Sequence, residues 1–167
     1  LLYAQRRQVG DEALFQGRKT LRLNPTVITS DVDEFERALQ ANDLDAAVRL
    51  YRGPFLDGFF LKDAPEFERW ADQQRGRLAR RAVEALRALA GRSADQGDHR
   101  SAAESWRRAV EVDPFDSGTA LGLVLCLASA GDRVGALVAA RRHEDLLRQD
   151  LGVAPDATFS EAVAQLR

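Results

Sequence analysis

A helix break that recurs at a fixed interval is the feature that most limits how this chain can fold. Gly97-Asp98 and Gly131-Asp132 each join a glycine that can end one helix to an aspartate that can cap the next, and the two pairs lie 34 residues apart. Asn42-Asp43 has the same character, because asparagine also adopts the left-handed conformation that ends helices. Apolar residues recur at helical spacing between these breaks. The sequence therefore predicts a chain of helices joined by tight turns.

The expected helices follow from these breaks. One begins near Val32, a second follows Asp43, and a long one begins at Pro65 and ends near residue 95; the others cover about 99–112, 117–130, 133–149 and 157–166. A period of 34 residues is that of tetratricopeptide repeats. We therefore expect a mostly α-helical, tetratricopeptide-like solenoid of about three helical hairpins with a terminal capping helix. Small residues at matching positions of two repeats, Ala102 and Ala136, are expected to let paired helices approach closely.

An insertion of 21 residues separates the first hairpin from this frame. It falls around the loop from Tyr51 to Phe60, which is dense in aromatic residues and punctuated by glycine and proline. Two interpretations are open: the loop wedges the first hairpin against the long helix, or it presents aromatic surface to a partner. The candidate protein-interaction residues are Tyr51, Phe55, Phe59, Arg75, Arg77 and Arg81. The arginines also fit a solvated helix face with some ion pairs.

The first 25 residues are basic, whereas the rest of the chain is acidic. Five basic residues stand against two acidic ones up to residue 25, and the remainder holds 19 basic and 24 acidic residues. Short alternating runs on either side of residues 17–19 predict a β-hairpin. A helix end followed by such a hairpin is how a winged helix contacts DNA, although the spacing alone also fits ordinary surface charges. The candidate DNA-binding residues are Arg6, Arg7, Arg18 and Lys19.

Composition excludes several classes of protein. The net charge is −2 and the isoelectric point is near 5.8, which argues against a chain that wraps nucleic acid over its whole surface. No apolar run approaches the roughly 18 residues of a membrane span, so we expect no membrane association. A single cysteine cannot form an internal disulfide, and a reducing, cytoplasmic setting is expected. Because the chain lacks methionine, we expect it to be processed or to be a piece of a longer protein.

The motifs of enzymes and of metal sites are missing from the sequence. No phosphate-binding loop, dinucleotide fingerprint, nucleophile elbow or metal-ligand spacing occurs, so we expect neither an enzyme nor a cofactor. The two histidines, His99 and His143, are predicted to be solvated surface residues, because each is flanked by charges on a predicted helix. Cys126 lies in an apolar stretch and is predicted to be a buried, inert thiol.

Several stretches resemble the bacterial transcriptional activator domain of the Streptomyces antibiotic regulatory protein family of actinobacterial activators. The most specific is the loop motif Leu50-Tyr-Arg-Gly-Pro-Phe-Leu-Asp-Gly-Phe59, which a generic tetratricopeptide array does not carry. The other matching stretches are Arg22-Leu-Asn-Pro25, Asp31-Val-Asp-Glu-Phe-Glu36, Ala64-Pro-Glu-Phe-Glu-Arg-Trp70 and Leu151-Gly-Val-Ala-Pro155. The resemblance divides the chain into residues 26–167, the activator domain, and residues 1–25, which look like the end of an OmpR-type winged helix: its recognition-helix tail and wing.

The resemblance implies a module of a bacterial DNA-binding transcription regulator. In such a regulator the winged helix binds promoter DNA while the helical domain contacts the winged helix, RNA polymerase holoenzyme or a second copy in a homodimer. Most of the winged helix is absent from this sequence. The implied contact with DNA is therefore expected to be made largely by residues that this sequence does not contain.

An alternative function from a different class is a peptide-binding adaptor of the tetratricopeptide type, with no role at DNA. Its concave face would hold a segment of another protein, and the basic N-terminus would be incidental. The motifs of the loop around Gly53 and Pro54 favour the regulator over the adaptor.

Overall fold

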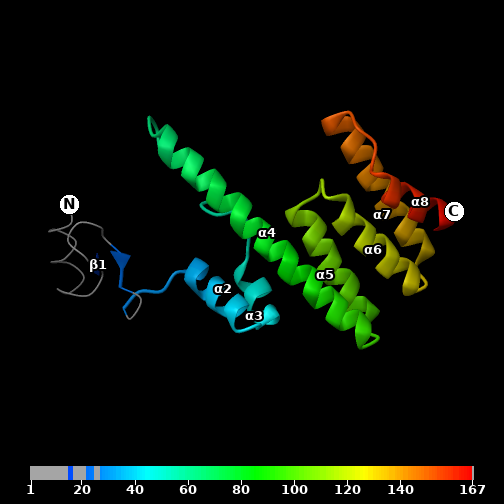
Figure 1. Cartoon of the computed structure of the whole chain (residues 1–167), viewed down its shortest axis with the longest axis horizontal. Coiled ribbons are helices and arrows are strands. Elements are labelled where there is room, and N and C mark those ends of the chain that lie inside the picture. Colours follow the sequence, from blue (N-terminus) through cyan, green and yellow to red (C-terminus); the bar gives the residue numbers. More distant parts are fainter. Residues whose placement is uncertain (1–14, 17–21, 25–26, 167) are drawn as a thin grey trace.

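The computed structural model describes residues 15–16, 22–24 and 27–166, and this part of the chain is mostly α-helical (Figure 1). A mostly helical chain was predicted, and the helix bounds agree closely with the sequence prediction. The helices are α2 (Asp31–Gln40), α3 (Leu44–Leu50), α4 (Pro65–Asp95), α5 (His99–Val112), α6 (Ser117–Ser129), α7 (Arg133–Leu146), the π-helix η1 (Leu147–Leu151) and α8 (Ala157–Leu166).

The predicted punctuation explains where these helices begin and end. Each of the three capping aspartates accepts a hydrogen bond from the backbone amide three residues later, at 2.8–3.0 Å; these are Asp43, Asp98 and Asp132. The residue before each aspartate has a positive φ: 56° at Asn42, 78° at Gly97 and 82° at Gly131. The recurring break is therefore a left-handed residue that ends one helix, followed directly by the cap of the next.

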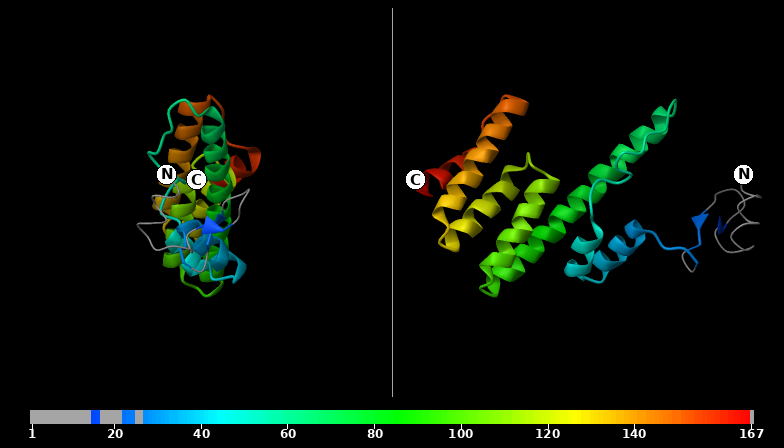
Figure 2. Two further views of the ribbon diagram at one scale, coloured as in Figure 1. Left: turned by 90° about the vertical axis from the view of Figure 1, so that its left-hand side faces the viewer. Right: turned by 180° about the vertical axis from the view of Figure 1, so that it is seen from behind.

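The helices pack in chain order. α2 packs against α3, α3 against α4, α4 against α5, α5 against α6 and α6 against α7, while α8 contacts both α6 and α7. The long helix α4 begins with Pro65 in its first turn, and its N-terminal turns project beyond the neighbouring helices, as two further views confirm (Figure 2). The body is therefore an elongated row of helices with one free helix end.

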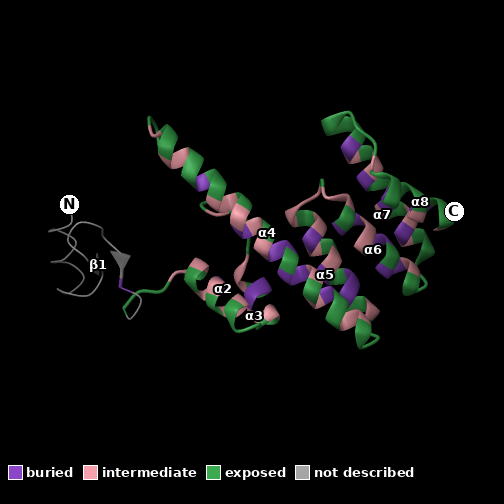
Figure 3. Ribbon diagram, in the orientation of Figure 1, coloured by how far each residue is buried: buried purple, intermediate pink, exposed green. Residues whose placement is uncertain are grey.

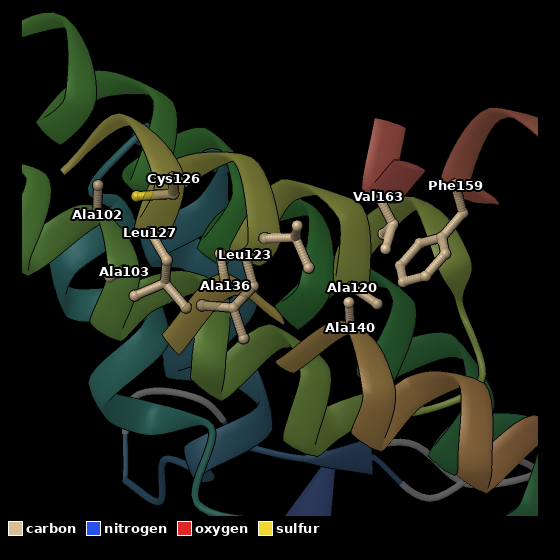
Figure 4. Close-up of a cluster of buried hydrophobic side chains, with 11 residues drawn as sticks. Ala102, Ala103, Ala120, Leu123, Cys126, Leu127, Ala136, Ala140, Phe159 and Val163 are labelled. Carbon is tan, nitrogen blue, oxygen red and sulfur yellow. The ribbon is translucent and has the colours of Figure 1, made fainter. Parts of the chain in front are cut away.

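Buried residues follow stripes along the helices where neighbours meet (Figure 3). The largest cluster joins α5, α6, α7 and α8, and its side chains interdigitate around Phe159 and Leu123 (Figure 4). The two small residues matched by the 34-residue frame, Ala102 and Ala136, are both fully buried in it. Smaller clusters, around Phe35 and around Leu86, join α2 and α3 to α4 and α5.

Two details depart from the sequence prediction. The helix expected to run to about residue 149 is α-helical only to Leu146 and continues as the π-helix η1, which ends at Gly152 with φ 68°. His143, predicted to be a solvated surface residue, is 4% exposed, so that prediction was wrong. Its ring lies 5.0 Å from that of Phe159, because α8 folds back over α7 and covers the histidine. The prediction of a buried thiol at Cys126 is confirmed.

The N-terminal part shows two short strands. β1 (Phe15–Gln16) pairs antiparallel with β2 (Arg22–Leu23), with Phe15 opposite Leu23. The expected turn at residues 17–19 lies outside the described residues, so the wing-like hairpin stays a prediction. All four candidate DNA-binding residues, Arg6, Arg7, Arg18 and Lys19, also lie outside them.

Among the described helices, none combines the length and the apolar character that crossing a membrane requires.

Candidate functional site

The loop after α3 packs its first aromatic residue inward. Tyr51 is half-buried, and its ring lies 6.0 Å from the ring of Phe35 on α2. Both rings belong to the cluster that also contains Leu78 of α4. Burial raises the pKa of the Tyr51 phenol above its ordinary value. This end of the loop therefore acts as a wedge between the first hairpin and the long helix.

Arg75 of α4 holds the middle of the loop in place. Its Nε donates to the carbonyl oxygen of Phe55 at 2.8 Å, and its Nη2 donates to that of Leu56 at 3.2 Å. Leu56 has φ 51°, a left-handed conformation that costs a non-glycine residue about 1–2 kcal/mol. A third contact, from Nη1 to Asp72 at 2.7 Å, orients the guanidinium group. Arg75 therefore stabilises a strained backbone turn that sets the direction of the rest of the loop.

Beyond this turn the aromatic side chains form a connected group. The rings of Phe55 and Trp70 meet edge to face at 5.6 Å, those of Phe67 and Trp70 lie 5.6 Å apart, and those of Phe59 and Phe67 meet edge to face at 5.9 Å. The loop is joined to α4 here by the Leu61 amide, which donates to the Glu68 carboxylate at 2.9 Å. We call the following residues the aromatic patch: Phe55, Phe59, Phe60, Leu61, Phe67 and Trp70.

The outer part of the aromatic patch is open to solvent. Phe60 is 77% exposed, Phe59 49% and Trp70 45%. Among the described residues, no other helix lies beside the projecting turns of α4 (Figure 1). Contiguous exposed apolar surface of this kind is typical of protein-interaction sites, whereas isolated exposed apolar residues are ordinary.

The other two candidate arginines, Arg77 and Arg81, lie on the opposite side of this region and contact α2. Arg77 Nη1 lies 2.7 Å from Glu36 Oε1, and Arg81 pairs with the other oxygen of the same carboxylate. Arg77 also donates to Gln74. Both guanidinium groups therefore bind α2 to α4 within the chain, and their contact with a partner stays a prediction.

The structure thus brings together four of the six predicted interaction residues. One loop and the helix face beneath it carry all four: Tyr51, Phe55, Phe59 and Arg75. Both interpretations of the loop apply to part of it. Tyr51 packs inward as a wedge, Phe59 is exposed as partner-facing surface, and Phe55 lies between them. Their binding role is still a prediction.

Sequence reasoning missed four residues of the aromatic patch: Phe60, Leu61, Phe67 and Trp70. Trp70 has nearly half of its surface exposed. The available signal was the run of three apolar residues at 59–61, just before the proline that starts a helix. A packed loop rarely carries three consecutive large apolar side chains, because they cannot all point inward.

The side chains of this region are of the kind that bind a partner by apolar contact. Within residues 15–16, 22–24 and 27–166, no group of three or more histidine, cysteine, aspartate or glutamate residues is arranged to hold a metal ion. The patch offers large apolar rings with the polar Trp70 indole, while the nearby Glu68 and Arg75 are joined to the backbone of the loop.

Comparison with known proteins assigns the family. The bacterial transcriptional activator domain matches residues 29–167, a span that contains every helix from α2 to α8 and the loop that carries the aromatic patch. No curated protein matches the chain. The family is one of regulatory domains that activate transcription, and the chain belongs to the bacterial transcriptional activator domain family.

Proposed function

We propose that this chain is the helical regulatory module of a bacterial DNA-binding transcription regulator, and that the aromatic patch is its contact face for the transcription machinery. The observation that carries the proposal is a solvent-open aromatic patch on the free end of α4 in a chain of the activator domain family. RNA polymerase holoenzyme is the principal partner in this proposal, which places the protein in the cytoplasm.

Physical chemistry supports a protein as the occupant of this patch. Binding energy at protein interfaces is concentrated in a few aromatic and arginine side chains that become desolvated. Phe60 and Trp70 are such side chains, and the backbone that carries them is already held by Arg75 and Glu68. Because the loop is ordered before binding, little conformational entropy is lost when a partner covers it.

We also propose that the chain is divided into two parts. Residues 26–167 form the activator domain, a stack of hairpins of the tetratricopeptide-like kind, and residues 1–25 are the end of a winged helix whose basic residues lie near promoter DNA. The winged helix and a second copy of the chain are further partners of the helical body. Replacing Arg18 and Lys19 with alanine in the intact regulator should reduce the salt dependence of promoter binding, because the slope falls by about one for each phosphate that is no longer neutralised.

The experiment that tests the contact face is a titration of the 167-residue chain against RNA polymerase holoenzyme by surface interferometry. Phe60→Ala should weaken binding about tenfold or more, because truncating a central interface aromatic commonly costs this much. The matched control is Phe115→Ala. It removes an aromatic ring that is 42% exposed and lies in the connection between α5 and α6. Equal binding by both variants, or no saturable binding by the parent chain, would overturn the proposal.

The family match does not favour the alternative of a peptide adaptor without a role in transcription.

A further inference from the structure

A groove with a volume of about 580 Å³ lies on the other half of the molecule, between α5 and α7. α5 forms one wall and α7 the other, and α6 provides the floor through Ala120, Leu123 and Leu127. Its volume is within the range of about 300–1,000 Å³ that is usual for binding sites. The groove is separate from the aromatic patch, with which it shares no residue.

The inner surface of the groove is largely apolar. Val110 of α5 and Ala139 of α7 face it beside the leucines of the floor. Val138, on the rim, is 59% exposed, although valine is a residue that folding normally buries. An apolar segment placed here would remove Val138 and the half-buried Val110 and Ala139 from water, which is the main source of affinity at such sites.

His143, at one end of the groove, has a hydrogen-bond partner at each ring nitrogen. His143 Nδ1 donates to the carbonyl oxygen of Pro114 at 3.2 Å, since a carbonyl can only accept. Nε2 lies 2.9 Å from the Ser117 hydroxyl. These two contacts tie α7 to the connection between α5 and α6, so the groove exists before anything binds.

The charged residues that line the groove are mainly basic. Its charged lining residues are Arg107 and Glu111 on one wall and Arg142 on the other. Glu111 lies one turn from Arg107 and offsets it, whereas the wall of Arg142 has no acidic lining residue. The Arg142 side chain has no ion pair or hydrogen bond with any described residue, so its charge is available to a partner. With two arginines against one glutamate, the lining carries a net charge of +1 above an apolar floor.

We propose that the groove docks an acidic amphipathic segment of a partner protein. Apolar side chains of that segment lie over Val138 and Leu123, and a carboxylate pairs with Arg142. The chain's own N-terminal 25 residues do not fit, because they carry five basic residues against two acidic ones. This inference goes beyond the contact with the transcription machinery and does not depend on it.

The test uses a fluorescein-labelled peptide of about 12 residues, in which leucines recur at helical spacing and glutamates fill the other positions. Fluorescence anisotropy measures its binding to the full chain, and a peptide with lysine in place of each glutamate is the control. We expect saturable binding of the glutamate peptide and binding at least about tenfold weaker for the lysine peptide. Equal affinities, or no saturation of the glutamate peptide up to about 1 mM, would overturn the proposal.

Variants of the chain locate the binding. Arg142→Glu should weaken binding of the glutamate peptide about tenfold, whereas Arg141→Glu, which changes the adjacent exposed arginine outside the groove, should change it less than about twofold. Val138→Glu should also weaken binding, and Leu125→Glu, at an exposed position of α6 outside the groove, should not. All four positions are exposed, so the variants are expected to fold. Equal losses within either pair would contradict the assignment.

Two further readouts separate the other outcomes. If the chain self-associates in size-exclusion chromatography and Arg142→Glu abolishes this, then a second copy occupies the groove and the proposal is overturned. The Arg142→Glu variant should lose peptide binding but bind RNA polymerase as strongly as the parent chain. That result would show that the groove and the aromatic patch bind independently.

Discussion

Asp116 shows how one carboxylate can join two helices. It caps α6, where its Oδ1 accepts from the amide of Gly118 at 3.1 Å, and its Oδ2 accepts from the Thr119 hydroxyl at 2.6 Å. Arg87 of α4 pairs with the same carboxylate and also contacts Thr119. Burial by itself raises the pKa of Asp116, but the Thr119 hydrogen bond, the Arg87 charge and the backbone amides outweigh it and hold that pKa below its ordinary value.

A pH dependence of stability follows from this lowered pKa. A carboxylate whose pKa is depressed by folding adds stability above its unfolded pKa, and this stability is lost as the pH falls through the folded value. We expect Asp116→Asn to be less stable than the parent chain at neutral pH, and the difference in free energy of unfolding to shrink below about pH 4. Urea unfolding across this range measures it, and a difference that stays constant with pH would contradict the assignment.

Gly122 on α6 is a second residue whose identity the packing demands. A Cβ there would lie 2.5 Å from the Trp106 ring on α5. Gly122→Ala should therefore lower the free energy of unfolding by about 1–3 kcal/mol through overpacking. The matched control is Gly91→Ala on α4, where an added Cβ meets nothing within 4 Å and should raise stability by about 0.5–1 kcal/mol. Chemical denaturation gives both values, and a stabilised Gly122→Ala would show that the two helices can separate at no cost.

At the scale of whole helices, one carboxylate on α2 pairs with two arginines on α4. Glu36 is shared by Arg77 and Arg81 and its side chain is 19% exposed, whereas the Asp45–Arg92 pair between α3 and α4 leaves Asp45 58% exposed. Water screens the second pair far more than the first.

We therefore expect Glu36→Gln to destabilise the chain by about 1–2 kcal/mol and Asp45→Asn by less than about 0.5 kcal/mol. Thermal or urea unfolding of the two variants provides the comparison. If their losses are equal, partial burial has no influence on the strength of these ion pairs.

The elements were largely predictable from the sequence, because their boundaries are local. Asn42, Gly97 and Gly131 adopt the left-handed conformation expected of them, and the aspartate after each one caps the next helix. The change from α-helix to π-helix at Leu147 was not predicted, because no start or stop signal for a helix marks this position.

The sequence predicted that aromatic residues form the candidate site, but it did not predict which of their side chains are exposed. The loop motif identified aromatic residues of the loop, and apolar residues at helical spacing indicated an apolar face on the long helix. Whether such a face is covered depends on where the neighbouring helices end, and α4 extends past all of them. For the same reason the burial of His143 escaped prediction, since Phe159, which covers it, comes from another helix.

At the scale of the whole molecule, packing in chain order produces an elongated body with two separate surfaces (Figure 2). The aromatic patch occupies the free end of α4, and the groove between α5 and α7 lies in the C-terminal half. Because each helix packs mainly on its neighbours, a change at one surface is expected to leave the other intact. This separation allows the two contacts to be tested one at a time.

The most direct test of the central claim is hydrogen–deuterium exchange of the chain with and without saturating RNA polymerase holoenzyme. We predict slower amide exchange in residues 55–70, which contain the aromatic patch, with unchanged exchange in α8. The loop should be protected because covering Phe59, Phe60 and Trp70 immobilises the backbone that bears them. Unchanged exchange in residues 55–70 while holoenzyme is bound would contradict the assignment of this patch as the contact face.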